Sequence, residues 1–175
     1  MKIFEYKSYD DYKQAQIEAN KKKLHWVYVQ ESTIKLICDY RTAKNVLCHG
    51  TRRGVEQQYF KKFIPDVYVV GTEISDTATQ FEDTVEWDFH NQKNEWVGKF
   101  DIVYSNSLDH SYKPKECVDV WKEQLNKDGN LFIEWHRVNL KSNRWDPFSG
   151  TLEQWVDMLK PIDILENGEY KILVI

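Results

Sequence analysis

The sequence has 175 residues, of which 41% are hydrophobic and 30% charged, and its formal net charge is −4. This length and balance exclude a disordered chain and predict one folded domain over residues 1–175. The acidic charge argues against nucleic acid as the main partner, because phosphate binding needs a concentrated basic surface. Three cysteines without CxxC spacing, no signal-peptide pattern and no apolar run of membrane-spanning length predict a cytoplasmic protein that binds no membrane.

Residues 1–44 are predicted to be mainly helical. Ser8 and Asp11 have the spacing of a capping box, and Tyr12–Leu24 holds strong helix formers without Gly or Pro. A second helix is predicted over Glu31–Tyr40, because its apolar residues recur at helical spacing.

From Asn45 onward, short apolar runs alternate with helical segments. The predicted strands are Val46–Cys48, Val67–Val70, Thr84–Trp87, Phe100–Tyr104, Asn130–Glu134, Ile162–Leu165 and Tyr170–Ile175. Helices are predicted after Gly50, from Pro114, and from a second capping box at Thr151. Alternation of this kind indicates a mostly parallel sheet with helices on both faces. Asn167-Gly168 predicts a hairpin, so we expect an α/β fold with an antiparallel C-terminal pair of strands.

Polar and aromatic side chains follow the ends of the predicted strands. In an open parallel sheet these ends meet at one edge, where ligands bind. The turn Gly50–Gly54 would bring backbone N–H groups and a helix N-terminus close to a ligand there. A carboxylate at Glu73 can accept two hydrogen bonds from a ribose diol. Asp88 can accept one hydrogen bond from an adenine amino group, while the Phe89 ring packs on the base.

Four segments resemble, in order, motifs of the class I (Rossmann-like) S-adenosylmethionine-dependent methyltransferases, a family with many small-molecule members. They are Val46–Gly54, Val69–Ser75, Phe100–Asn106 with Leu108–His110, and Gly129–Ile133. The resemblance implies a Rossmann-like core over residues 45–175, with residues 1–44 as a helical lid over the cofactor.

The resemblance also implies S-adenosyl-L-methionine as the cofactor. The residues it assigns to cofactor binding are His49, Gly50, Thr51, Arg52, Gly54, Glu73, Ile74, Asp88, Phe89, Ser105 and Asn106. Two positions depart from the family pattern, since Cys48 stands where an acid is usual and Arg52 where the middle glycine is usual. Arg52 could reach the cofactor's carboxylate or fill the gap that the glycine would leave.

The resemblance implies a methyltransferase that acts on a small-molecule acceptor. Methyl transfer to an alcohol or phenol needs positioning and a base. His110 and His136 are the candidate catalytic residues, with His110 ranked first. The polar loop that begins at His136 is expected to contact the acceptor, and Arg137 or Arg144 would suit an anionic acceptor.

Three other functions would use similar residues. A metal site built from His49, His90, His110 and His136 lacks paired-ligand spacing, so we expect no metal. An NAD-dependent oxidoreductase needs a full GxGxxG turn, which Gly50–Gly54 does not have. A non-catalytic S-adenosylmethionine-binding protein, either a sensor or a subunit, stays open because the first motif is altered. The sequence identifies neither the acceptor nor the oligomeric state.

Overall fold

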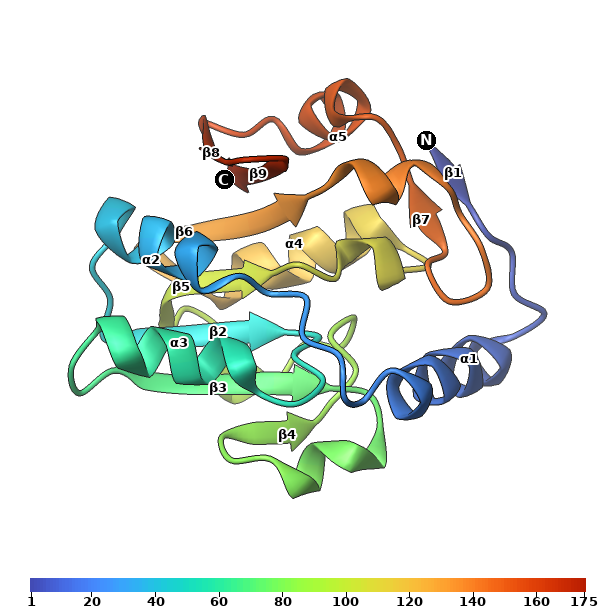
Figure 1. Ribbon diagram of the computed structural model, residues 1–175, viewed down its shortest axis with the longest axis horizontal. Helices are drawn as coiled ribbons and strands as arrows, with labels where there is room; N and C mark the ends of the chain where they lie inside the picture. The colour runs from blue at the N-terminus through green and yellow to red at the C-terminus, as the bar shows by residue number, and fades with distance from the viewer.

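The computed structural model describes residues 1–138 and 140–175, and it contains a seven-stranded sheet (Figure 1). From one edge to the other the strands are β4 (Thr84–Glu86), β3 (Tyr68–Glu73), β2 (Asn45–His49), β5 (Phe100–Ser105), β6 (Leu125–Trp135), β9 (Tyr170–Val174) and β8 (Asp163–Asn167). Neighbouring strands are parallel except at β9, which runs antiparallel to β6 and β8. The predicted α/β fold, with a mostly parallel sheet and a C-terminal hairpin, is confirmed.

Helices cover both faces of this sheet (Figure 1). Their bounds are α1 (Tyr9–Lys22), α2 (Glu31–Tyr40), α3 (Val55–Phe63), α4 (Pro114–Gln124) and α5 (Leu152–Leu159). On one face α2 and α3 pack on Val46 and Cys48 of β2, and on the other α4 and α5 pack in the cluster that holds Leu47. Successive side chains of a strand point to opposite faces, so this alternation divides the core into two halves.

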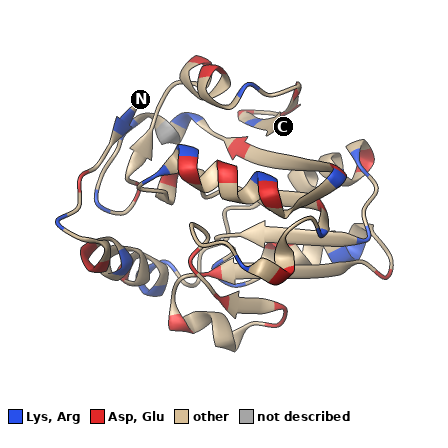
Figure 2. Ribbon diagram, turned by 180° about the vertical axis from the view of Figure 1, so that it is seen from behind, with Lys and Arg blue, Asp and Glu red and all other residues tan. Residues whose placement is uncertain are grey.

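The sequence of α4 explains its position against the sheet. Pro114 occupies the first turn, where its missing N–H costs nothing. Cys117, Val118 and Trp121 follow at helical spacing and are buried, while the charged residues between them are exposed. Figure 2 shows Lys, Asp and Glu interspersed along the outer face of this helix.

Helix α1 lies beyond the carboxyl ends of β2 and β3 (Figure 1). The Ser8 side chain caps it by accepting the Asp11 N–H, so the helix begins at Tyr9, directly after the predicted cap. By contrast, α2 packs beside α3 on the sheet face, where Ile34 and Ile37 are fully buried. Of the segment expected to form a lid, only α1 and the chain that follows it lie over the strand ends.

A small second sheet joins β1 (Lys2–Ile3) to β7 (Phe148–Ser149), and the sequence did not predict it. Short 3₁₀ turns, at Asp76–Gln80, Asn94–Trp96, Leu108–His110 and Arg137–Leu140, complete the chain. Among the described residues, none of the helices has the length and apolar character needed to cross a membrane.

Candidate functional site

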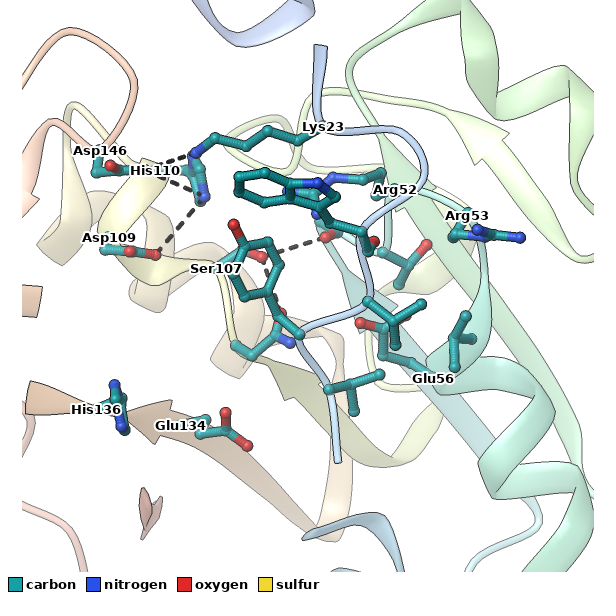
Figure 3. A pocket seen from close by; sticks show the side chains of 18 of the residues that line it. Lys23, Arg52, Arg53, Glu56, Ser107, Asp109, His110, Glu134, His136 and Asp146 are labelled. Carbon is teal, nitrogen blue, oxygen red and sulfur yellow. Dashed lines mark hydrogen bonds and ion pairs between the residues drawn. The ribbon is translucent and has the colours of Figure 1, made fainter. Parts of the chain in front are cut away.

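Two adjoining cavities lie at the carboxyl edge of the sheet. The larger has a volume of about 420 Å³ and the smaller about 50 Å³, and Gly50, Arg52, Ser107 and His110 line both. The larger cavity lies against the segment that joins α1 to α2 (Figure 3), and the smaller lies against α1. Because they share these four residues, they form one hollow, whose parts we call the large lobe and the small lobe.

The turn between β2 and α3 forms the floor shared by the two lobes. Gly50 has a φ of 74°, and a Cβ there would lie 2.7 Å from the Ser107 Cβ, so glycine is required. Arg52 has a φ of 50°, a left-handed conformation that costs energy for a residue with a side chain. Its guanidinium carbon lies 5.1 Å from the centre of the Tyr28 ring, and its Nη1 donates to the Trp26 carbonyl at 3.4 Å. Arg52 therefore links this turn to the segment after α1 while it lines both lobes.

Glu73, at the end of β3, lines the small lobe together with Ile74. Its carboxylate accepts the backbone N–H groups of Arg52, at 3.1 Å, and Ser75, at 3.2 Å. Burial raises its pKa above the usual value. Beside it, the buried Nδ2 of Asn20 in α1 is near enough to the Glu73 carboxyl to lower its pKa, but it forms no hydrogen bond of normal geometry among the described residues. A carboxylate beside an unsatisfied N–H donor matches a ribose diol, whose hydroxyls both donate and accept.

Asp88 and Phe89 also line the small lobe. Both oxygens of Asp88 have partners, because Oδ1 lies 2.7 Å from the His90 Nδ1 and Oδ2 accepts the Tyr9 hydroxyl at 2.8 Å. The second contact ties the start of α1 to the edge of the sheet. An adenine amino group at this position would have to share the Asp88 carboxylate with Tyr9 or displace it.

His110 lies where the two lobes meet. Its Nδ1 lies 2.9 Å from the Trp145 carbonyl and 3.0 Å from the Gln16 Oε1. Since a carbonyl only accepts hydrogen bonds, Nδ1 must carry the proton and donate it. The neutral ring therefore keeps its lone pair on Nε2, which lies 4.0 Å from an Asp109 oxygen and 3.8 Å from an Asp146 oxygen. This geometry places an unprotonated ring nitrogen near two carboxyl groups at the junction of the lobes.

Asp109, His110 and Asp146 are also a group that could hold a metal ion. One ligand atom from each lies within 4.8 Å of the others. However, the Lys23 ammonium lies 3.8 Å from the same Asp146 oxygen, as Figure 3 shows, and supplies positive charge to this group. We therefore assign no metal to these residues.

The remaining predicted residues of the large lobe come from three elements. Thr51, Asn106 and His136 all line it, as do two acids, Glu56 and Glu134, that are nearly fully buried. The His136 ring stacks on Tyr170 at a centroid distance of 4.4 Å. His136 therefore lies on the wall of the lobe opposite the turn after β2.

Three predicted cofactor residues line neither lobe. His49 is buried in the core, where it stacks on Trp121 at 4.9 Å and its Nε2 lies 2.8 Å from the Gln124 Oε1. Burial lowers the pKa of His49 to about 4, so its ring is neutral at pH 7. Ser105 is fully buried and donates to the His49 carbonyl at 3.0 Å. Gly54 has a φ of 74° and precedes α3. The structure gives these residues roles in holding the turn.

Other residues of the hollow were missed by sequence reasoning. Asn20 and Lys23 reach it from α1 and the residue after it, and only tertiary packing brings them there. The two arginines expected for an anionic acceptor are paired with acids instead. Arg137 lies 3.0 Å from Glu169, and Arg144 lies 2.6 Å from Asp11.

No known protein-family model matches the chain, and no curated protein matches it in sequence. Solved structures match its fold. One is the 1,6-didemethyltoxoflavin-N1-methyltransferase of Burkholderia thailandensis, solved with bound 1,6-didemethyltoxoflavin and S-adenosylhomocysteine. It is 15% identical, with a TM-score of 0.74 over 98% of this chain and 91% of that one.

Two further matches are S-adenosylmethionine-dependent methyltransferases. The TehB-like enzyme of Corynebacterium glutamicum has a TM-score of 0.61 and 13% identity over 92% of this chain and 96% of that one. The enzyme of Aquifex aeolicus has a TM-score of 0.61 and 13% identity over 84% of this chain and 97% of that one. The chain therefore has the fold of the class I S-adenosylmethionine-dependent methyltransferases.

Proposed function

We propose that this protein binds S-adenosylmethionine in the hollow and transfers its methyl group to a small-molecule acceptor. The observation that carries the proposal is the pairing of Glu73 with the unsatisfied Asn20 amide in the small lobe, next to the Gly50 turn. Glu73 and Asn20 would hold the ribose, Ile74 and Phe89 would contact the adenine, and the Gly50 turn would face the methionine end. The Burkholderia thailandensis enzyme, which has this fold, was solved with S-adenosylhomocysteine and 1,6-didemethyltoxoflavin bound.

The size of the small lobe adds a condition to this proposal. A cavity of about 50 Å³ has room for a few water molecules and not for a nucleoside. Tyr12, Gln16 and Asn20 of α1 form its outer wall. Cofactor binding therefore requires α1 to move outward. Polar contacts at its ends, such as Tyr9 to Asp88, would break and re-form.

The cofactor, when bound, would supply an electrophilic methyl group. His110 would then act as the general base for the acceptor, because its Nδ1–H is held by the Trp145 carbonyl and its Nε2 faces the lobes. As Nε2 takes the acceptor's proton, Asp109 and Asp146 would stabilise the positive ring. His136 lies farther along the wall of the large lobe and would contact the acceptor.

Calorimetry tests the proposal directly. We expect saturable binding of S-adenosylhomocysteine and weak or no binding of NAD, whereas a preference for NAD would refute the assignment. Incubation with methyl-labelled cofactor and a metabolite extract then separates enzyme from binding protein. Label transfer identifies the acceptor, while tight cofactor binding without any transfer would favour the non-catalytic alternative.

A further inference from the structure

Two glutamates contribute buried acidic groups to the large lobe. Glu56 lies in the first turn of α3 and Glu134 near the end of β6, and they are only 6% and 7% exposed. Both line the lobe, and Figure 3 shows that they reach it from different elements. Burying a carboxylate is costly unless a cation or several hydrogen bonds compensate it. Their partners therefore decide what this part of the lobe can bind.

Among the described residues, neither glutamate forms an ion pair with a cationic side chain. Glu134 accepts a hydrogen bond from the Tyr104 hydroxyl at 3.3 Å, and the side chain of Asn106 is a neighbour of Glu56. In the part of the chain that the structure describes, no Lys, Arg or His nitrogen lies within 4.0 Å of either carboxyl group. Burial accordingly raises the pKa of Glu56 to about 8 and that of Glu134 to about 7.

The positive side chains of the large lobe are engaged elsewhere. The Lys23 ammonium lies 3.8 Å from Asp146. Arg52 and Arg53 each donate to a backbone carbonyl of residues 25–26, at 3.4 and 3.5 Å. The Arg52 charge acts on Glu56 without pairing with it directly. A ligand with a positive charge could pair directly with both buried glutamates.

Aromatic rings border the same lobe. Trp26 and Tyr28 line it and remain 48% and 50% exposed, and the Arg52 guanidinium lies over the Tyr28 ring. Tyr170 lies across the lobe, beneath His136. The faces of such rings attract cations within about 6 Å of their centres. Carboxylates and exposed rings around one cavity thus provide both interactions that select an ammonium group.

We propose that Glu56 and Glu134 form a binding site for an organic ammonium group, bordered by the Trp26 ring. The bound ammonium group belongs either to the acceptor or to the amino-acid end of the cofactor. These two sources rest on the proposed function, whereas the ammonium site itself does not. The ammonium keeps its protons, and the two carboxyls release theirs to the solvent as they ionise beside it. The site recognises the ligand and does not react with it.

The probe is phenethylammonium, with 2-phenylethanol as its neutral counterpart, titrated by calorimetry at pH 7 in two buffers of different ionisation enthalpy. We expect the ammonium to bind at least about tenfold more tightly than the alcohol and to release about one proton. Glu56→Gln and Glu134→Gln should each weaken its binding by about tenfold and reduce the proton release. Glu153→Gln, at an exposed position in the first turn of α5, is the matched control and should change neither quantity.

A second titration identifies the source of the ammonium group. It compares S-adenosylhomocysteine with 5′-methylthioadenosine, which lacks the amino-acid end. If the group is the cofactor's, the two glutamine variants lose affinity for the first compound only, and phenethylammonium competes with it. If the group is the acceptor's, the variants bind both compounds as wild type does, and phenethylammonium binds the protein already saturated with S-adenosylhomocysteine.

The proposal is overturned if both glutamine variants bind every ligand as the wild type does, or if ammonium and alcohol bind alike without proton release. If the wild-type protein binds neither adenosine compound, the proposed function is refuted. The titration with phenethylammonium still tests the ammonium site in that case. Thermal unfolding of each variant verifies that it is folded. Glutamine matches the neutral carboxyl in size and charge, so we expect folded proteins.

Discussion

Glu73 offers the sharpest test of the cofactor site, because its carboxylate has two functions that different substitutions separate. It accepts the N–H groups of Arg52 and Ser75, and it is proposed to accept hydroxyl groups of the ribose. Glu73→Gln keeps one acceptor oxygen and the size of the side chain but removes the charge. A hydrogen bond to a charged group contributes about 1.5–3 kcal/mol. We therefore expect the affinity for S-adenosylhomocysteine to fall by about tenfold to a hundredfold.

Glu73→Ala should have a second effect, on folding. It leaves one buried and one part-buried N–H donor without an acceptor, each costing up to about 1–3 kcal/mol, so the melting temperature of the ligand-free protein should fall by roughly 5–15 °C. Calorimetry and thermal unfolding measure the two effects. Glu86→Gln is the matched control, because Glu86 lies opposite Glu73 on β4 and is exposed. Wild-type affinity in Glu73→Gln would remove this residue from the ribose site, and an unchanged melting temperature in Glu73→Ala would refute the hydrogen-bond argument.

Four further outcomes are expected. His110→Ala should lower turnover by about 10²-fold or more with little change in cofactor affinity. If the variant has the turnover of the wild type, His110 has only a packing role. S-adenosylhomocysteine should alter amide hydrogen exchange in α1, and identical exchange with and without ligand contradicts the lid. The pKa of His49 is about 4 in the folded protein and 6.5 for a free histidine side chain. The unfolded chain therefore takes up a proton first as the pH falls, and the folded state loses stability. Denaturant unfolding at pH 7.5 and 4.5 should differ by about 2–3 kcal/mol more in wild type than in His49→Gln. The contribution of Glu56 to stability depends on pH in the opposite direction. Its pKa in the folded state is raised to about 8, so the neutral carboxyl stabilises the fold at low pH, and this stabilisation is lost as the pH rises through 8. Unfolding at pH 6 and 9 should therefore show about 2–3 kcal/mol more loss in wild type than in Glu56→Gln, and equal losses would contradict the shift.

Local signals predicted most of the fold. The capping box at Thr151 and Gln154 is present at the start of α5, and Glu31–Tyr40 is helical over the predicted range. Strand β6 begins at Leu125, five residues before the predicted Asn130, because its pairing with β5 shifts register and continues past Gly129. Sequence patterns describe regular pairing, so an irregularity of this kind escapes them.

The site was harder to predict, since it depends on the direction of each side chain. His49 follows Leu47 by two residues, so both side chains point to the same face of β2, into the cluster below α4. The alternation of side chains along the strand therefore predicts that His49 belongs to the core. No comparable sequence pattern points to Asn20 and Lys23. Helical periodicity does not show which residues near the end of α1 lie close to a strand that is distant in the sequence.

The short pairing of β1 with β7 has a consequence for any attempt to change the acceptor. The same N-terminal segment donates the Phe4 N–H to the Pro147 carbonyl at 2.8 Å and the Tyr6 hydroxyl to the Arg144 carbonyl at 2.6 Å. Segment 2–6 thus acts as a clamp on the loop that brings Asp146 to the large lobe. Substitutions in the clamp and in the loop should be non-additive. An exchange of this loop between homologous proteins would succeed only if residues 2–6 were exchanged with it.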